Sequence, residues 1–185
     1  MKTKFIPGLQ FCGQFYAQVV RPLLEKHFPA LEYSAALLGS GSEIIGFDTP
    51  MSTDHHWGPR VMLFVRETDL HLAPRIRQML AENLPYSFMG YSTHFSEPDP
   101  NDNGVQHLTL VDSGPVNHRV TVQTPLSLVT EQLGLDHADN LSSADWLSIP
   151  EQRLLTLTAG AVYHDGIGLE EVRQRFSYYP REVWL

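Results

Sequence analysis

The sequence has little of three features that would each indicate a class of protein. Cys12 is the single cysteine among 185 residues, which excludes an intrachain disulfide framework and fits a reducing compartment. No run approaches the roughly 20 apolar residues of a membrane-spanning helix, and the N-terminus lacks the apolar core of a signal peptide. We therefore expect a soluble, cytoplasmic protein with no membrane partner, in which Cys12 is a small buried side chain.

Basic residues are also scarce. Lys and Arg number 13 against 21 Asp and Glu, which gives a net charge of −8, and the basic residues form no stripe. Because binding to a phosphate backbone needs clustered Lys and Arg, a nucleic-acid partner is not expected. The hydrophobic content of 42% is enough for one domain, or one domain with a small appendage. Nothing in the sequence indicates the oligomeric state.

Two short apolar runs surround the most informative part of the chain. Residues 33–38 (YSAALL) and 60–65 (RVMLFV) are too short for independent helices and are typical of buried strands. The first run leads into residues 39–42 (GSGS), whose small side chains allow several backbone N–H groups to converge on one anion. Residues 43–47 could add one helical turn whose dipole favours the same anion. Gly39, Ser40 and Ser42 are therefore candidate phosphate-binding residues, although such a turn is also an ordinary connection after a strand.

A carboxylate and two imidazoles precede the second run. In an extended segment Asp54 and His56 lie on one face and His55 on the other, so Asp54 and His56 could share a metal ion. The alternative is structural: the histidines form hydrogen bonds beside the Gly58-Pro59 turn while the neighbouring tryptophan packs.

These motifs carry a resemblance. A strand, Gly-Ser, a short helix and then an Asp-x-Asp pair on the next strand is the pattern of the nucleotidyltransferase superfamily, and Gly39-Ser40 with residues 54–56 resembles a variant of it. More closely, residues 5–9, the block at 52–60 (STDHHWGPR), residues 154–165 and residues 178–180 resemble an uncharacterised bacterial family, a domain of unknown function grouped with the nucleotidyltransferase-like folds. The resemblance covers nearly the whole chain, and its most specific part is the D-H-x-W-G-P-R block.

The resemblance implies a metal-dependent nucleotidyl transfer. In such enzymes paired carboxylates hold Mg²⁺ on the nucleotide phosphates, and a third carboxylate on a later strand activates the attacking hydroxyl. This chain has His56 where the second carboxylate is expected, so Mg or Mn is joined by Zn as a candidate metal. The later strand, residues 119–124, has no acid, which leaves Asp112 as the nearest candidate base. Arg60 follows the block directly and is the candidate for neutralising phosphate charge.

Three accounts of residues 54–56 stay open: a nucleotidyl transfer site with altered metal chemistry, a transition-metal site, and a retired catalytic site. We expect a nucleotidyltransferase-like protein that binds a nucleotide and a divalent metal and transfers a nucleotidyl group to a small-molecule or protein hydroxyl. The alternative is a catalytically degenerate nucleotide- or metal-binding regulatory domain.

The remaining patterns predict an α+β fold with a nucleotidyltransferase-like mixed sheet of about five strands, flanked by helices. Residues 7–27 and 70–84 are amphipathic and predict helices, the first with Pro22 inside it. Residues 86–95, 106–111 and 118–124 predict strands, and residues 97–104 a solvated loop.

From residue 125 the pattern becomes helical. Helices are predicted over residues 126–133, 142–147, 151–163 and 169–176, with His164-Asp165-Gly166 either at a helix C-terminus or in a His-Asp site that reaches the cleft. We expect residues 1–124 to form the nucleotidyltransferase-like core and residues 125–185 a helical C-terminal segment. The resembled family continues into a larger helical region, so a truncated product, a fragment and a short homologue are all compatible with the ending.

Overall fold

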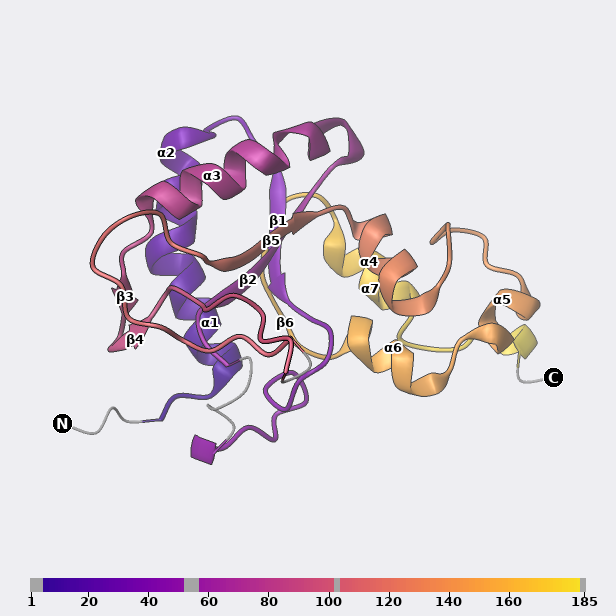
Figure 1. Cartoon of the computed structure of the whole chain (residues 1–185). Helices are drawn as coiled ribbons and strands as arrows, with labels where there is room; N and C mark the ends of the chain where they lie inside the picture. Colours follow the sequence, from indigo (N-terminus) through magenta and orange to yellow (C-terminus); the bar gives the residue numbers. More distant parts are fainter. Residues whose placement is uncertain (1–4, 52–56, 102–103, 184–185) are drawn as a thin grey trace.

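A computed structural model of the chain describes residues 5–51, 57–101 and 104–183 (Figure 1). The fold is α+β. Its centre is a four-stranded mixed sheet of strand order β5-β2-β1-β6, in which the strands are β1 (Tyr33–Leu37), β2 (Arg60–Val65), β5 (Arg119–Gln123) and β6 (Ala161–Asp165). Strand β1 runs antiparallel to both β2 and β6, whereas β2 and β5 are parallel.

The strands predicted at residues 33–38, 60–65 and 118–124 are confirmed. All five residues of β1 are buried, as expected of an interior strand whose sequence is apolar on both faces. Alternation along the strands separates two cores: Ala35 and Leu63 belong to one, Ala36 and Phe64 to the other. Helices therefore cover both faces of the sheet (Figure 1).

The N-terminal helix predicted over residues 7–27 is confirmed and covers the first face. It consists of α1 (Gly8–Phe15), a π-helical turn, η1 (Tyr16–Val20), and α2 (Arg21–His27). Pro22 has no N–H to donate to the preceding turn, and the widened turn lies directly before it. Helix α3 (Ala73–Asn83), preceded by the 3-10 helix η3 (Glu67–Leu72), packs on the same core through Ile76 and Leu80.

The second face is covered by the C-terminal helices: α4 (Pro125–Leu133), α5 (Ser143–Ser148), α6 (Glu151–Thr158) and α7 (Leu169–Arg175), followed by the 3-10 helix η4 (Arg181–Val183). Their ends are specified locally. Gly134 adopts a left-handed conformation with φ 76° after α4, and Ser142 and Asp145 form a reciprocal capping box at α5. A helical C-terminal segment is thus confirmed.

One helix prediction in that segment is wrong in its second half. The helix expected over residues 151–163 ends at Thr158, and residues 161–165 form β6, so His164 and Asp165 end a strand and not a helix. The reason is tertiary: β6 pairs with β1, more than 120 residues away in sequence, and local periodicity carries no record of that partner. The sheet accordingly draws on both sides of the boundary expected at residues 124 and 125.

Two strand predictions also fail. Residues 106–111 contribute only one isolated bridge in the described structure, Leu108 to Phe95, although their apolar and polar residues alternate. Residues 86–95 form a small separate hairpin, β3 (Ser87–Phe88) and β4 (Tyr91–Ser92), whose turn has positive φ at Met89 and Gly90. The helical turn expected at residues 43–47 is a non-helical turn.

None of the helices in the described part of the chain combines the length and the apolar content that crossing a bilayer would require.

Candidate functional site

The antiparallel pairing of β1 and β2 places the Gly-Ser bend and the end of the D-H-x-W-G-P-R block at one edge of the sheet. The register matches Ala36 with Met62, so the chain that leaves β1 after Leu37 lies beside the chain that enters β2 at Arg60. The bend at residues 39–42 and the turn at Gly58-Pro59 are therefore neighbours in space.

The bend contains backbone N–H groups that have no hydrogen-bond acceptor among the described residues. Gly39 and Gly41 have φ of +102° and +146°, conformations that side chains disfavour. The Gly39 N–H donates to the Thr156 carbonyl of α6 at 2.8 Å, but the N–H groups of residues 40–43 have no acceptor in the ranges that the structure covers. Because Ser40 and Gly41 are exposed, an anion could reach these donors.

A buried ion pair supports the bend from beneath. Glu43 is 7% exposed and forms an ion pair with Arg60, the first residue of β2. Burial lowers the pKa of the Arg60 guanidinium, since desolvation disfavours its charged form, and the Glu43 carboxylate compensates that cost. A Cβ at Gly41 would lie 2.6 Å from Glu43 Oε2, so glycine at position 41 leaves room for the carboxylate. The predicted phosphate ligand Arg60 thus has an internal partner already.

The bend gives a first prediction, for Gly41→Ala. Its Cβ would force Glu43 to move in a backbone region that is itself strained, so we expect a loss of about 2 to 3 kcal/mol in the free energy of unfolding. The matched control is Gly46→Ala, with φ +75° and no atom within 4 Å of the added Cβ, which should lose only about 1 kcal/mol. Equal losses in urea unfolding would show that Glu43 is not crowded.

The start of α1 completes the cluster. Gly8, the first residue of the helix, donates its N–H to Asp48 Oδ2 at 2.6 Å, and Cys12 donates its thiol to the Gly58 carbonyl at 3.3 Å. Burial raises the pKa of the Cys12 thiol, which keeps it protonated and makes it a packing residue, as expected. Trp57, which is 4% exposed, packs against the same helix.

The other predicted site residues fall into two groups. Asp54, His55 and His56 lie outside the described residues. Asp112 lies in an exposed loop, where its carboxylate accepts a hydrogen bond from Ser113. Among described residues no three His, Cys, Asp or Glu side chains are grouped closely enough to hold a metal ion, so a metal site would need ligands from residues 54–56 or from a bound ligand.

The end of α6 and strand β6, both in the C-terminal segment, pack behind the bend and form its wall. Besides the Gly39 bond to Thr156, the Gly160 N–H donates to the Ile44 carbonyl at 3.2 Å, and the Tyr163 hydroxyl donates to the Leu9 carbonyl at 2.9 Å. Strand β6 and the end of α6 thereby hold the bend and the start of α1 in place.

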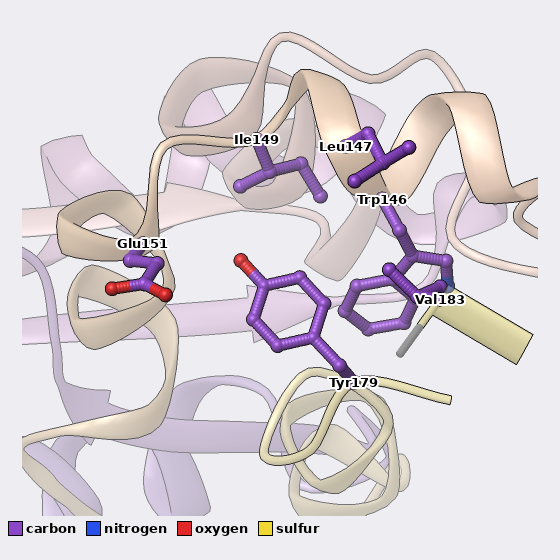
Figure 2. Close-up of a pocket in the computed structure, with 6 residues that line it drawn as sticks. All are labelled: Trp146, Leu147, Ile149, Glu151, Tyr179 and Val183. Carbon is purple, nitrogen blue, oxygen red and sulfur yellow. The ribbon is translucent and has the colours of Figure 1, made fainter. Parts of the chain in front are cut away.

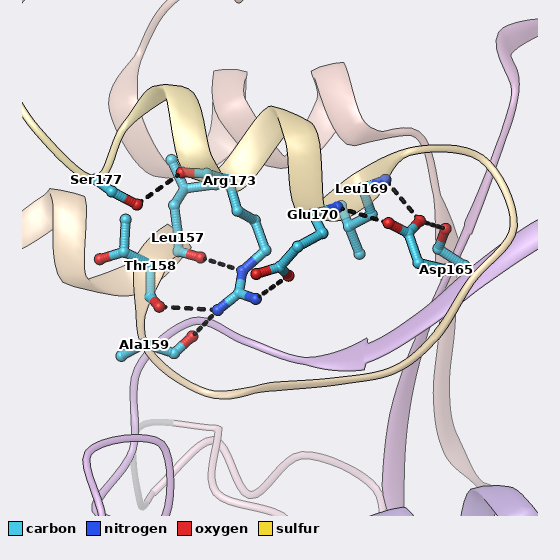
Figure 3. Close-up of polar contacts among 9 residues, drawn as sticks. Leu157, Thr158, Ala159, Asp165, Leu169, Glu170, Arg173 and Ser177 are labelled. Carbon is cyan, nitrogen blue, oxygen red and sulfur yellow. Dashed lines mark hydrogen bonds and ion pairs between the residues drawn. The ribbon is translucent and has the colours of Figure 1, made fainter.

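Arg173 fixes the C-terminal end of α6 (Figure 3). This 7% exposed side chain donates to the carbonyls of Leu157 at 2.8 Å, Thr158 at 2.8 Å and Ala159 at 3.1 Å, and pairs with Glu170. Its cation satisfies carbonyls that the helix itself leaves without donors. This role could not be predicted from the sequence, because Arg173 stands in an ordinary amphipathic pattern.

Asp165 fixes the start of α7. Its carboxylate accepts hydrogen bonds from the Leu169 N–H at 2.8 Å, the Glu170 N–H at 3.0 Å and the Ser34 hydroxyl at 2.6 Å. Partial burial alone would raise the pKa of Asp165, but the hydrogen bonds from Ser34 and the two N–H groups outweigh it and lower the pKa. Asp165 is thus a helix cap, which neither sequence alternative anticipated.

The lowered pKa gives a second prediction. A carboxyl whose pKa is lower in the folded than in the unfolded chain stabilises the fold above the unfolded pKa and loses this effect as pH falls through the folded pKa. Wild type should therefore exceed Asp165→Asn by about 1 kcal/mol in free energy of unfolding at pH 7, and the difference should shrink as the pH falls below about 3.9, the ordinary pKa of an aspartate, and through the lower folded pKa. Glu131→Gln, at an exposed acid of α4, should show no such dependence. A difference between wild type and Asp165→Asn that does not decrease at acidic pH would contradict the prediction.

A separate hollow lies on the C-terminal segment. It has a volume of about 210 Å³, is lined by Trp146, Leu147, Ile149, Glu151, Tyr179 and Val183, and places the rings of Tyr179 and Trp146 side by side, 5.5 Å apart between centroids (Figure 2). None of its lining residues belongs to the bend.

Comparison with known proteins identifies one feature of this segment. Residues 146–185, which include α6, β6 and α7, match the family model of a domain of unknown function, DUF4037. The matched residues all belong to the C-terminal segment, and they include Thr156, Gly160 and Tyr163, which contact the bend and the start of α1. No curated protein and no solved structure matches the chain.

Proposed function

We propose that the chain binds a nucleotide together with a divalent metal at the edge of the sheet where the Gly-Ser bend meets the start of β2. The observation that carries the proposal is the run of backbone N–H groups at residues 40–43, which lack acceptors within the part of the chain that the structure describes and which begins at the exposed residues Ser40 and Gly41. Such a run suits the oxygens of a phosphate group.

The roles follow from the chemistry of each side chain. Gly39, Ser40 and Ser42 shape the bend and bind phosphate. Asp54 with His56 would hold the metal, which is Mg or Mn, and the imidazole of His56 makes Zn a further candidate. When bound, the metal would compensate phosphate charge. Arg60 contributes positive electrostatic potential next to the bend, although its ion pair with Glu43 offsets that potential.

The proposed reaction is transfer of a nucleotidyl group to a small-molecule or protein hydroxyl, with Asp112 as the candidate base. A nucleic-acid acceptor remains disfavoured by the net charge of −8. In the described structure the Asp112 carboxylate lies in an exposed loop and accepts a hydrogen bond from Ser113. The reaction would need this carboxylate to approach the bend.

A second candidate function is a nucleotide- or metal-binding regulatory domain without turnover. The observation that favours it is the composition of β5, which lies parallel beside β2 and pairs Arg119 with Arg60. No residue of β5 is acidic, so the strand beside the site supplies no carboxylate to activate a hydroxyl.

Thermal unfolding tests the proposal. With ATP, CTP, GTP or UTP and Mg²⁺, Mn²⁺ or Zn²⁺, at least one pair should raise the melting temperature of wild type, because a ligand at about 100 times its Kd adds about 2.7 kcal/mol. The shift should disappear in Asp54→Ala and persist in Asp69→Ala, a control acid in η3.

The outcomes separate the two functions. A metal-dependent shift with conversion of labelled nucleotide supports transfer, and a shift without conversion supports the regulatory domain. If no nucleotide changes the melting temperature of wild type with any of these metals, the proposal is wrong.

A further inference from the structure

A second set of hydrogen-bond donors lies next to the bend, at the N-terminus of α1. This helix has no acidic residue in its first turn and no cap from its own side chains. Its Gly8 N–H is instead satisfied by Asp48, a carboxylate from the loop that follows the bend, at 2.6 Å. A helix N-terminus attracts negative charge, and here the charge comes from 40 residues away.

The indole of Trp57 places a hydrogen-bond donor without a partner beside the start of α1. Trp57 is 4% exposed, and its Nε1–H has no hydrogen-bond partner among the residues described. A Cβ at Gly8 would lie 3.2 Å from this nitrogen, so the donor borders the first residue of α1. The ring is held rigidly, stacked on Phe11 at 5.0 Å and edge-on to Tyr91 at 4.8 Å between centroids.

A buried donor without a partner is costly, because it has left water without gaining a protein acceptor. Arg60 adds a second such donor, since its Nε–H is also buried and unmet in the described structure. The pairing of Glu43 with Arg60 uses a different nitrogen, NH2. Two buried donors near the start of α1 are therefore without acceptors in the described structure, as is expected of a site that receives an anion.

This group of donors and the bend both border one side chain, that of Glu43. A Cβ at Gly8 would lie 2.7 Å from Glu43 Cβ, and a Cβ at Gly41 would lie 2.6 Å from Glu43 Oε2. One ligand with two adjacent oxyanions could therefore reach both places.

We propose that the N-terminus of α1 and the indole of Trp57 form a second oxyanion site, which the Asp48 carboxylate occupies in the absence of ligand. A phosphate group of a polyphosphate ligand displaces Asp48 there, while the bend binds the neighbouring phosphate. Asp48 is then an internal competitor that lowers the apparent affinity for the ligand. The inference rests on the proposed function for the identity of the natural ligand, and not for the binding of the anion.

The first test uses the indole resonance of Trp57 in ¹⁵N-labelled protein, identified by its loss in Trp57→Phe. Titration with inorganic pyrophosphate should move this N–H signal downfield as it gains an acceptor, whereas the indole of Trp146, remote from the bend, should not move. If the Trp57 signal stays unchanged up to saturation, the site does not exist.

The second test measures the affinity of variants for pyrophosphate by calorimetry. Asp48→Asn keeps an oxygen acceptor for the Gly8 N–H but removes the competing charge, so it should bind pyrophosphate about tenfold more tightly than wild type. Glu131→Gln removes one exposed charge from α4 and should bind as wild type does. Unchanged or weaker binding by Asp48→Asn would overturn the inference.

The two proposals can fail separately. Tighter pyrophosphate binding by Asp48→Asn, in a protein that no nucleotide stabilises, supports the oxyanion site and refutes the proposed function. Stabilisation by nucleotide without any response of Trp57 or Asp48→Asn refutes this inference alone.

Discussion

Gly160→Ala should lower the free energy of unfolding by about 3 to 5 kcal/mol. Gly160 connects α6 to β6 with φ +86°, and an added Cβ would overlap the carbonyl oxygen of Leu37 and lie 3.2 Å from Leu38 Cδ2. The backbone oxygen belongs to the central strand and cannot move aside without breaking the pairing of β1 with β6. Urea unfolding followed by circular dichroism measures the loss.

Gly168→Ala is the matched control. Its φ of +81° is nearly the same, but no atom lies within 4 Å of the added Cβ, so only the backbone strain of about 1 to 2 kcal/mol applies. If the two variants lose equal stability, the close approach of Gly160 to β1 is not real.

Arg173→Met should lower the free energy of unfolding by about 3 kcal/mol. The methionine fills much of the same volume but leaves the carbonyls of residues 157–159 without donors at the buried end of α6. Arg173→Lys should recover little, because one ammonium cannot reproduce the planar fork that reaches all three carbonyls.

Arg175→Met provides the comparison within the same helix. Arg175 pairs with Asp139 and Glu171 at the surface, with 36% of its side chain exposed, so its replacement should cost less than about 1 kcal/mol. Equal effects at positions 173 and 175 would contradict the role assigned to Arg173.

Gly160 and Arg173 both act in the C-terminal segment, where the sequence predicted the helices better than the strand. Strands β1, β2 and β5 were predictable because each is an apolar or alternating run bounded by turn residues. Strand β6 was not, since its partner is β1, and the sequence preceding it continues a helical pattern. The strand predicted over residues 106–111 is wrong for the opposite reason. These residues alternate well, but within the described structure no strand pairs with them beyond the isolated bridge of Leu108.

The candidate site also has one part that the sequence predicts and another that depends on tertiary packing. The bend at residues 39–42 was predictable from its glycines and from its place after a strand, because that chemistry is local. The contacts of Gly8 with Asp48 and of Glu43 with Arg60 join separate elements, so they depend on packing that no motif encodes. Trp57, expected only to pack, also carries a buried donor that the described residues leave without an acceptor.

Hydrogen–deuterium exchange of the peptide that covers residues 39–47 tests the central claim most directly. If the N–H groups of residues 40–43 bind phosphate, saturating nucleotide with Mn²⁺ should slow their exchange in wild type by about tenfold or more. Gly41→Ala should lose this protection, and Gly46→Ala should keep it. Unchanged exchange at residues 40–43 in nucleotide-bound wild type would contradict the account, because the phosphates would then lie elsewhere.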